Sequence, residues 1–313
     1  MRLARVGAFA AVLLLTACAT PQHTSTLTVS GLSSGGYAAG LLHVAFAERI
    51  DGVGIIAAGP YDCARGDIAR ALGPCLRGQD LMVDGMVAHA RAGASSGAVA
   101  TTAAVAGDRV WLMHGTRDTV VARDVVEATG QFYRALGARV TEVLDVDAPH
   151  GLPTRAAGGA CDRMGAPFLN ACGYDAAGEL LQTLMGRSAA AGGTASGTLT
   201  TVAQPAAAGL AADAYVYRPP QCQRGGCAVH IVLHGCQQGQ EFVDLALARD
   251  GGFNRWADAF DLVVLYPQVA ASAVNPLGCW DWWGYTGSQY ATRAAVQLNA
   301  ILTLAEALAE PAR

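Results

Sequence analysis

The sequence predicts an α/β fold in which helices flank a mostly parallel central sheet. Strand-like runs alternate with helical runs along the chain, and this alternation is typical of parallel sheets covered by helices. A Gly-x-Ser-x-Gly turn lies where the first strand-like run, which begins at residue 26, meets the first helical run. Candidate catalytic side chains also follow the ends of later strands. These observations together indicate one sheet that carries a reactive serine.

The elements are predicted in order along the chain. After the first strand and its turn, strands are predicted at 53–56, 109–113, 140–146, 215–217, 229–233 and 262–266, and helices at 37–50, 121–136 and 175–185. Residues 186–212 are rich in Ala, Gly, Thr and Ser with little periodicity, so we expect a long surface connection there. Neither side of this connection supplies a complete parallel sheet, so we expect one sheet built from both.

Residues 1–18 are predicted to form an export signal. Arg2 and Arg5 supply a positive start, and the apolar run over 6–17 is shorter than the ~20 residues that span a membrane. The run ends in Leu-Thr-Ala-Cys, which is similar to the lipobox of bacterial lipoproteins and predicts lipid modification of Cys18. An ordinary signal, cleaved near the same point, is the alternative. Either way we expect an exported protein, extracellular or anchored to the cell envelope.

The charge of the chain does not indicate nucleic-acid binding. The net charge is −4, and acidic and basic residues are interspersed, so no basic patch is predicted.

The use of cysteine agrees with export. Nine cysteines include Cys18, and the other eight are an even number, which suggests disulfides in an exported chain. Proximity in the sequence predicts the pairs Cys63 with Cys75, Cys161 with Cys172, Cys222 with Cys227, and Cys236 with Cys279. Eight cysteines permit 105 pairings, so this assignment is a hypothesis.

Ser33 is the predicted nucleophile. It occupies the centre of the Gly-x-Ser-x-Gly turn, where a sharp strand-to-helix bend holds a serine exposed. Gly31 and Gly35 flank it, and a side chain at either position would crowd the bend. A second match at 93–97 has no strand before it, so Ser95 is predicted to be structural.

Asp118 and His150 are the predicted partners of Ser33. Asp118 follows the strand at 109–113, and His150 follows the strand at 140–146, so acid and base both stand at strand exits. The order Ser, Asp, His is that of hydrolases with this turn. His114 is a competing base, but it lies only four residues from Asp118. Asp145 and Asp147 are competing acids for which a surface role is expected.

The backbone N–H groups of Ser34 and Cys236 are the predicted oxyanion hole. Ser34 follows the nucleophile, and Cys236 ends a strand that leads into a His-Gly turn like that of esterases. In an ordinary hydrolase this turn precedes the nucleophile, whereas here it follows about two hundred residues later. We therefore expect a circularly permuted α/β-hydrolase, with residues 19–313 as a single catalytic domain and 186–212 joining the former ends.

A zinc site is the alternative reading of the same region, because Cys222, Cys227, His230 and His234 superficially resemble a ligand set. The interval between Cys227 and His230 is too short for the usual finger, and both histidines belong to a strand-like run. We expect no metal and no cofactor.

The segment 275–285 holds three of the five tryptophans within four residues. A buried cluster accounts for one or two of them, while an exposed aromatic side chain at a cleft mouth would hold an apolar polymer or a sugar chain. A Cys236–Cys279 bridge would fix this segment beside the oxyanion hole. We therefore predict that Trp280 contacts the substrate.

These motifs resemble those of the poly(3-hydroxybutyrate) depolymerases, in their circularly permuted catalytic domain. The resemblance covers nearly the whole mature chain and rests on Gly-Leu-Ser-Ser-Gly-Gly-Tyr at 31–37, His-Gly-Cys-Gln-Gln at 234–238, Cys-Gly-Tyr-Asp at 172–175, Leu-Tyr-Pro-Gln at 265–268 and Gly-Cys-Trp-Asp-Trp-Trp-Gly-Tyr at 278–285. It implies hydrolysis of polyester bonds between 3-hydroxybutyrate units by the triad Ser33, Asp118 and His150. It also implies substrate contacts by Asn275 and Trp280.

The resemblance departs from the family at one point. Many secreted bacterial members continue into a polymer-binding domain, and we expect none after Arg313. Amorphous polymer, oligomers or other short-chain esters are therefore expected as substrates. Two other functions stay open. One is a carbohydrate esterase of the feruloyl or acetylxylan type, and the other is a non-catalytic envelope protein that binds through the aromatic segment.

Overall fold

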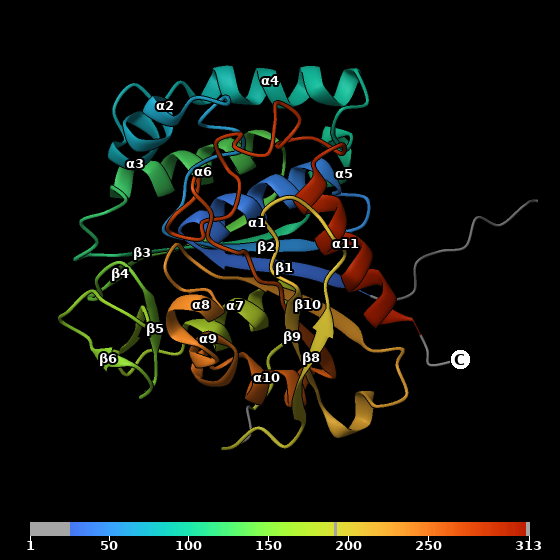
Figure 1. Ribbon diagram of the computed structural model, residues 1–313. Coiled ribbons are helices and arrows are strands. Elements are labelled where there is room, and N and C mark those ends of the chain that lie inside the picture. The colour runs from blue at the N-terminus through green and yellow to red at the C-terminus, as the bar shows by residue number, and fades with distance from the viewer. Residues whose placement is uncertain (1–25, 191–192, 311–313) are drawn as a thin grey trace, which may run out of the picture.

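The strands of one large sheet come from both halves of the chain. The computed structural model describes residues 26–190 and 193–310, so the predicted export signal and Cys18 lie outside the described residues. Eight strands form the sheet in the order β4-β3-β2-β1-β10-β11-β9-β8 (Figure 1). Their bounds are β1 Leu27–Leu32, β2 Gly52–Ile56, β3 Arg109–Gly115, β4 Arg139–Val146, β8 Thr198–Ala203, β9 Asp213–Arg218, β10 Ala228–Leu233 and β11 Leu262–Tyr266.

The pairing of the strands joins the two halves at the centre of the sheet. Strands β4, β3, β2, β1, β10 and β11 run parallel, and β9 and β8 add two antiparallel pairings at one edge. Strand β1 pairs with β2 on one side and with β10 on the other, with Gly31 opposite Leu233. The carboxyl ends of β1 and β10 therefore meet. This order agrees with a permuted α/β-hydrolase, in which the oxyanion strand (β10, which leads to Cys236) lies beside the nucleophile strand (β1, which leads to Ser33).

Helices cover both faces of the sheet. On one face α1 Ser34–Ala45 packs on β1 and β2, α6 Arg123–Ala135 on β3 and β4, and α11 Val296–Ala309 on β10 and β11 (Figure 1). On the other face α7 Ala176–Met185 contacts β2 and β3, and α10 Phe253–Phe260 contacts β11. The smaller elements are α2 Ile68–Leu72, α3 Pro74–Arg77, α4 Val83–Ser95, α5 Thr102–Val105, α8 Gln240–Val243, α9 Ala246–Asp250, a 3₁₀ turn at Pro220–Cys222, and a second sheet of β5 Leu152–Thr154, β7 Leu169–Ala171 and β6 Gly159–Ala160.

The core follows from the apolar strands. Every residue of β1, β2 and β11 is buried, as expected for strands covered on both faces. Helix α6 is amphipathic and buries Val125, Val126, Thr129, Phe132 and Tyr133, which recur at helical spacing. None of the helices among the described residues is long and apolar enough to cross a membrane.

Some boundaries differ from those that the sequence predicts. The first helix begins at Ser34, directly after the nucleophile turn, and ends at Ala45, because the chain turns back there toward β2. The segment 186–212 contains β8, which pairs with β9 over six residues and forms the edge of the sheet. Thus part of the predicted connection belongs to the sheet itself.

The eight cysteines of the described residues form four disulfides. The pairs are Cys63–Cys75, Cys161–Cys172, Cys222–Cys227 and Cys236–Cys279. These are the pairs that proximity in the sequence predicts, and the last of them ties the end of β10 to the aromatic segment.

Candidate active site

Ser33 lies at a strained turn between β1 and α1. Its backbone dihedrals are φ 56° and ψ −121°, a conformation that side chains rarely adopt and that costs about 1–3 kcal/mol. Two hydrogen bonds hold the turn, from Ser33 N to Ile56 O (2.9 Å) and from Tyr37 N to Ser33 O (3.0 Å). The sharp bend projects the hydroxyl from the carboxyl edge of the sheet, as in hydrolases with this turn.

The two glycines around Ser33 are required by close approaches of the main chain. A Cβ on Gly31 would lie 2.2 Å from the carbonyl group of Gly35. A Cβ on Gly35 would lie 2.2 Å from the carbonyl oxygen of Leu233, at the end of β10. The glycine pattern thus allows the bend itself and also lets the nucleophile turn pack against the oxyanion strand.

Asp118 and His150 form a buried pair. His150 Nδ1 donates to Asp118 Oδ2 at 2.7 Å, and Asp118 Oδ1 accepts from the N–H groups of Val120 (2.8 Å) and Val121 (2.9 Å). Burial alone would raise the pKa of the Asp118 carboxyl, but the hydrogen bond and charge of His150 and the two N–H donors outweigh it and lower that pKa. The Asp118 carboxylate therefore stays ionised and orients the imidazole ring of His150. The Nε2 atom of His150 is left free to accept a proton.

The competing candidates are occupied elsewhere. His114 Nε2 donates to the carbonyl of Val121 at 2.9 Å, which supports the loop of Asp118. Asp147 has a side chain 75% exposed and pairs with Arg117 on the surface. In the second Gly-x-Ser-x-Gly match, Ser95 lies at the end of α4 and its hydroxyl donates back to Arg91 O. Ser33 and His150 thus line one cavity and Asp118 is bound to His150, whereas His114, Asp147 and Ser95 have other partners.

Ser34 and Cys236 face the nucleophile from the two halves of the chain. Both line the cavity that contains Ser33 and His150, and a Cβ on Gly235 would lie 3.6 Å from Ser33 Cβ. Within the described residues, no hydrogen bond uses the backbone N–H of Ser34 or of Cys236. Two N–H groups without acceptors beside a serine hydroxyl are what an oxyanion hole requires.

His234 braces the turn before Cys236. Its Nδ1 donates to Gly235 O (2.8 Å), and its Nε2 accepts from Val269 N (3.2 Å). Burial lowers the pKa of His234 to about 4, so the ring is neutral and can make both bonds. Gln238 adds a third contact, since its side-chain oxygen accepts from Gly235 N at 2.8 Å.

The residues of the alternative zinc set have other partners. Cys222 and Cys227 form a disulfide with each other. His230 hydrogen-bonds with the hydroxyl groups of Thr28 and Ser30, both at 2.8 Å, and burial lowers its pKa to about 3. Among the described residues no cluster of His, Cys, Asp and Glu is arranged to hold a metal ion.

A largely apolar cavity of about 470 Å³ surrounds Ser33 and His150. One wall is formed by Ile68 and Leu72 of α2 and Leu76 of α3. Other walls come from the segments around residues 164–168 and 274–283. Sequence reasoning missed the first of these walls. The spacing of four residues between its members was the signal, since it places them on one face of a helical segment.

The aromatic segment places its tryptophans differently from the prediction. Trp282 and Trp283 line the cavity, and the Trp282 ring stacks on Tyr37 with centroids 4.1 Å apart. Trp280 is fully buried and is not part of the cavity lining. Its ring packs against His234, with ring centroids 5.3 Å apart. Trp280 is therefore not an exposed side chain at the cleft mouth, because its ring belongs to the core, and its predicted contact with the substrate stays a prediction.

Asn275 lines the cavity, as the family resemblance implies, but its polar atoms bind the protein. The side-chain oxygen accepts from Cys279 N (2.9 Å), and the amide nitrogen donates to Cys279 O (2.8 Å) and to Tyr285 Oη (3.2 Å). The residue is 2% exposed. The side chain of Asn275 therefore fixes the main chain of Cys279 through both its N–H and its carbonyl group.

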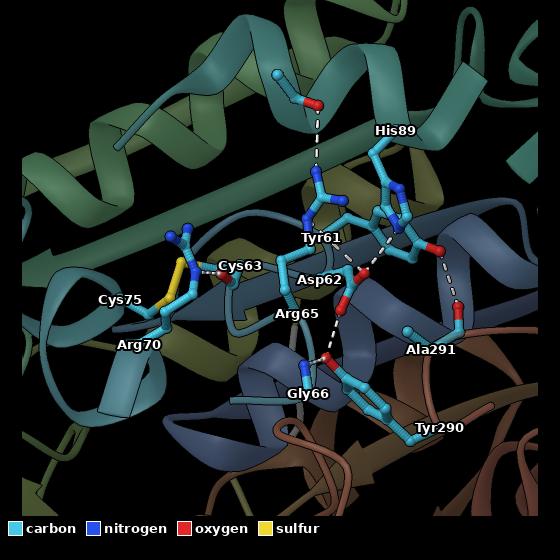
Figure 2. A network of polar contacts seen from close by, with 11 residues as sticks. Tyr61, Asp62, Cys63, Arg65, Gly66, Arg70, Cys75, His89, Tyr290 and Ala291 are labelled. Atoms are coloured by element: carbon cyan, nitrogen blue, oxygen red, sulfur yellow. Dashed lines mark hydrogen bonds and ion pairs between the residues drawn. A yellow bond between two sulfur atoms is a disulfide. The ribbon is translucent and has the colours of Figure 1, made fainter. Parts of the chain in front are cut away.

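A polar network around Asp62 ties one cavity wall to the aromatic segment. Figure 2 shows the Asp62 carboxylate between His89 of α4, at 2.8 Å, and the hydroxyl of Tyr290. Tyr290 Oη also accepts from Gly66 N at 3.0 Å, one residue before the cap of α2. The disulfide Cys63–Cys75 closes the same loop. Together these contacts fix α2 and α3 against the segment that follows Trp283.

The chain is similar to several known proteins. It is 36% identical to the poly(3-hydroxybutyrate) depolymerase of Delftia acidovorans over 291 residues, which are 89% of this chain and 58% of that relative. It thus spans little more than half the length of that relative. It is 32% identical to the polyhydroxybutyrate depolymerase of Talaromyces funiculosus over 304 residues, which are 89% of this chain and 88% of that relative. No protein-family model matches the chain.

Two solved structures share the fold. One is a depolymerase of the same name with a serine-to-alanine substitution, in complex with a trimer of R3HB, and the other is the enzyme of Penicillium funiculosum. The TM-scores are 0.85 and 0.83, both at 29% identity, and the alignments cover 91% and 90% of this chain and 96% and 95% of the solved chains.

Proposed function

This chain belongs to the poly(3-hydroxybutyrate) depolymerase family, and on that premise we propose that it is a serine esterase that hydrolyses poly(3-hydroxybutyrate) or its oligomers. The observation that carries the proposal is the Asp118–His150 pair at 2.7 Å, in which His150 lines the same apolar cavity as the strained Ser33. A neutral polyester chain suits a cavity with few polar atoms, since it carries no charge to solvate.

The proposed reaction has two steps. Ser33 Oγ attacks an ester carbonyl while His150 Nε2 takes the hydroxyl proton, and the N–H groups of Ser34 and Cys236 stabilise the oxyanion. The C–O bond of the ester then breaks, and His150 gives the proton to the departing alcohol. In the second step water attacks the 3-hydroxyacyl ester of Ser33 while His150 Nε2 takes a proton from the water. The bond between Ser33 Oγ and the acyl carbon then breaks, Ser33 Oγ takes the proton back from His150, and the acid is released.

We propose that Trp282 and Trp283 contact the polyester, with Trp280 packed behind them. Several exposed apolar side chains surround the opening of the cavity and would extend this surface: Ile68, Leu72, Met164, Val274 and Leu277. Trp283→Ala should raise KM for a 3-hydroxybutyrate trimer more than KM for a small chromogenic ester. Trp280→Ala is the comparison, and its main effect should be lower thermal stability, because a core side chain is removed.

Replacement of the nucleophile tests the proposal. Ser33→Ala should abolish release of 3-hydroxybutyrate from the trimer and labelling by a fluorophosphonate, with circular dichroism unchanged, while Ser95→Ala should keep both activities. Retained turnover in Ser33→Ala would contradict the assignment. A panel that includes feruloyl and acetylxylan esters addresses the alternative esterase, which the stacked wall of Tyr37 and Trp282 would also suit. Faster release of ferulate or acetate would favour it.

We also propose that the protein is exported. The four disulfides suit an oxidising compartment. Lipid modification of Cys18 is a separate proposal, which mass spectrometry of the mature amino terminus would test. A mature chain that begins after Cys18 without a lipid would contradict it.

A further inference from the structure

We propose that Asn275 is a positioning residue for the oxyanion hole and gives the substrate no hydrogen bond. In this proposal Asn275 fixes the main chain of Cys279, and the Cys236–Cys279 disulfide passes that constraint to the Cys236 N–H. The inference rests on the proposed function, because it assumes that an oxyanion forms beside Ser33.

The amide of Asn275 has no donor left for a substrate. Both of its N–H groups are used, one by Cys279 O and one by Tyr285 Oη. Tyr285 Oη in turn donates to Cys279 O (2.9 Å) and accepts from Gln297 Nε2 (2.9 Å). A substrate carbonyl could bind Asn275 only after one of these buried bonds broke, and a buried donor or acceptor left unpaired costs about 1–3 kcal/mol.

Cys279 is therefore held on three sides. Asn275 binds both its N–H and its carbonyl, Tyr285 binds the carbonyl again, and the sulfur is bonded to Cys236. The side chain of Asn275 closes a ring with the main chain of Cys279, four positions later in the sequence, so Cys279 has little freedom to rotate. A residue fixed in this way is a rigid anchor for its disulfide partner.

The oxyanion turn is attached to this anchor at two adjacent points. Cys236 is joined by the disulfide, and Gln237 N donates to Leu277 O at 2.7 Å. Within the described residues the Cys236 N–H makes no hydrogen bond, and Cys236 is one of the residues that line the cavity. Since an oxyanion donor must be held in place before the reaction, loss of the anchor should weaken stabilisation of the transition state more than binding of the ground state.

The experiment separates this role from substrate contact. The Asn275→Ala variant and the Cys236→Ala/Cys279→Ala double variant should each lower kcat for p-nitrophenyl butyrate by about tenfold or more, with KM within twofold of the parent, because a single oxyanion donor contributes about 10²–10³ in kcat. The inhibition constant of an alkyl trifluoromethyl ketone, which forms a tetrahedral adduct with the serine, should rise by the same factor as kcat/KM falls. The Cys222→Ala/Cys227→Ala double variant removes a disulfide far from the turn and should change neither value.

All rates are expressed per active site, counted by the end point of fluorophosphonate labelling. A variant that only misfolds would lose active sites while keeping its kcat per site, and that result would overturn the proposal. A raised KM for the 3-hydroxybutyrate trimer, with an unchanged kcat and inhibition constant, would show direct substrate contact and would also overturn it. If the parent protein is not labelled at Ser33, the proposed function fails, which is a different observation.

Discussion

Two buried histidines, His230 in β10 and His234 directly after it, should make this protein unstable in mild acid. His230 and His234 are both 0% exposed, and burial lowers their pKa values to about 3 and about 4, from an ordinary value of 6.5. In the folded protein both rings are therefore neutral at pH 5, whereas in the unfolded chain both are largely protonated. The stability that they contribute is present above pH 6.5 and is lost as the pH falls from there toward 4.

The magnitude follows from the two pKa values of each group. Between pH 7 and pH 5, preferential protonation of the unfolded chain lowers the free energy of unfolding by about 2 kcal/mol per histidine, or about 4 kcal/mol for both. The result barely depends on the folded pKa, provided that it lies below 5. Because domains are stable by only about 5–15 kcal/mol, the acid limit of activity should coincide with unfolding near this strand.

Urea unfolding measured by circular dichroism at pH 7, 6 and 5, without reductant, tests the calculation. His230→Gln should be less stable at pH 7, because Thr28 and Ser30 lose their partner, but its loss of stability from pH 7 to pH 5 should be about 2 kcal/mol smaller than that of the parent. Other titrating groups are shared, so they cancel in the comparison. Phe253→Leu is the matched control. The Phe253 ring stacks on His230 with ring centroids 5.5 Å apart, so the substitution removes packing around His230 without removing a titrating group. If His230→Gln and Phe253→Leu both show the parent's pH dependence, the reasoning is refuted.

Three further predictions concern the site and its supports. Gly35→Ala should lower thermal stability and slow fluorophosphonate labelling, because its Cβ would meet Leu233 O at 2.2 Å and overpacking costs about 1–3 kcal/mol or more; labelling at the parent's rate would contradict this. Asp118→Asn should reduce kcat by about 10⁴ with nearly unchanged KM, since His150 loses the acceptor that fixes its tautomer, and a loss below tenfold would argue against the assigned pair. Asp62→Ala should cost about 1–3 kcal/mol in urea unfolding, because the buried hydroxyl of Tyr290 loses its acceptor. It should also raise KM for the trimer, and a change in kcat alone would exclude the proposed support of the cavity wall.

The catalytic candidates could be predicted from the sequence because each depends on local signals. A strand, a glycine-bounded turn and a helix are contiguous around Ser33, so the bend is visible without knowledge of the fold. Asp118 and His150 each follow a strand, and parallel strands bring their carboxyl ends to one edge. For each of these three residues, its position just after a predicted strand was therefore enough to predict that it lies at the carboxyl edge of the sheet.

The roles of the three tryptophans in the aromatic segment could not be predicted in the same way. Trp280, Trp282 and Trp283 lie in a segment with no regular secondary structure, so no period assigns alternate side chains to the cavity and to the core. The choice is made by distant partners, with His234 against Trp280 and Tyr37 against Trp282. Likewise the role of Asn275 depends on bonds within its own loop, which residue type alone does not reveal.

The sequence does not reveal strand β8, for a related reason. Its six residues are half-exposed or exposed, and they alternate too weakly between apolar and polar types to mark a strand inside an Ala- and Gly-rich stretch. The pairing with β9 decides its conformation, so the signal lies in the partner strand. Edge strands covered by little of the core carry the least pattern of their own.

The joining of the two halves at β1 and β10 also explains why the site tolerates permutation. Ser33, Asp118 and His150 all come from the first half, and the oxyanion turn with its disulfide anchor comes from the second. What fixes their relation is the register of β1 against β10, with Gly31 opposite Leu233, and the close approach of Gly35 to the end of β10. None of these contacts depends on which half is made first, because they are made across the sheet and not along the chain. The order of the halves can therefore change while the geometry around the serine is kept, provided that both glycines and the register remain.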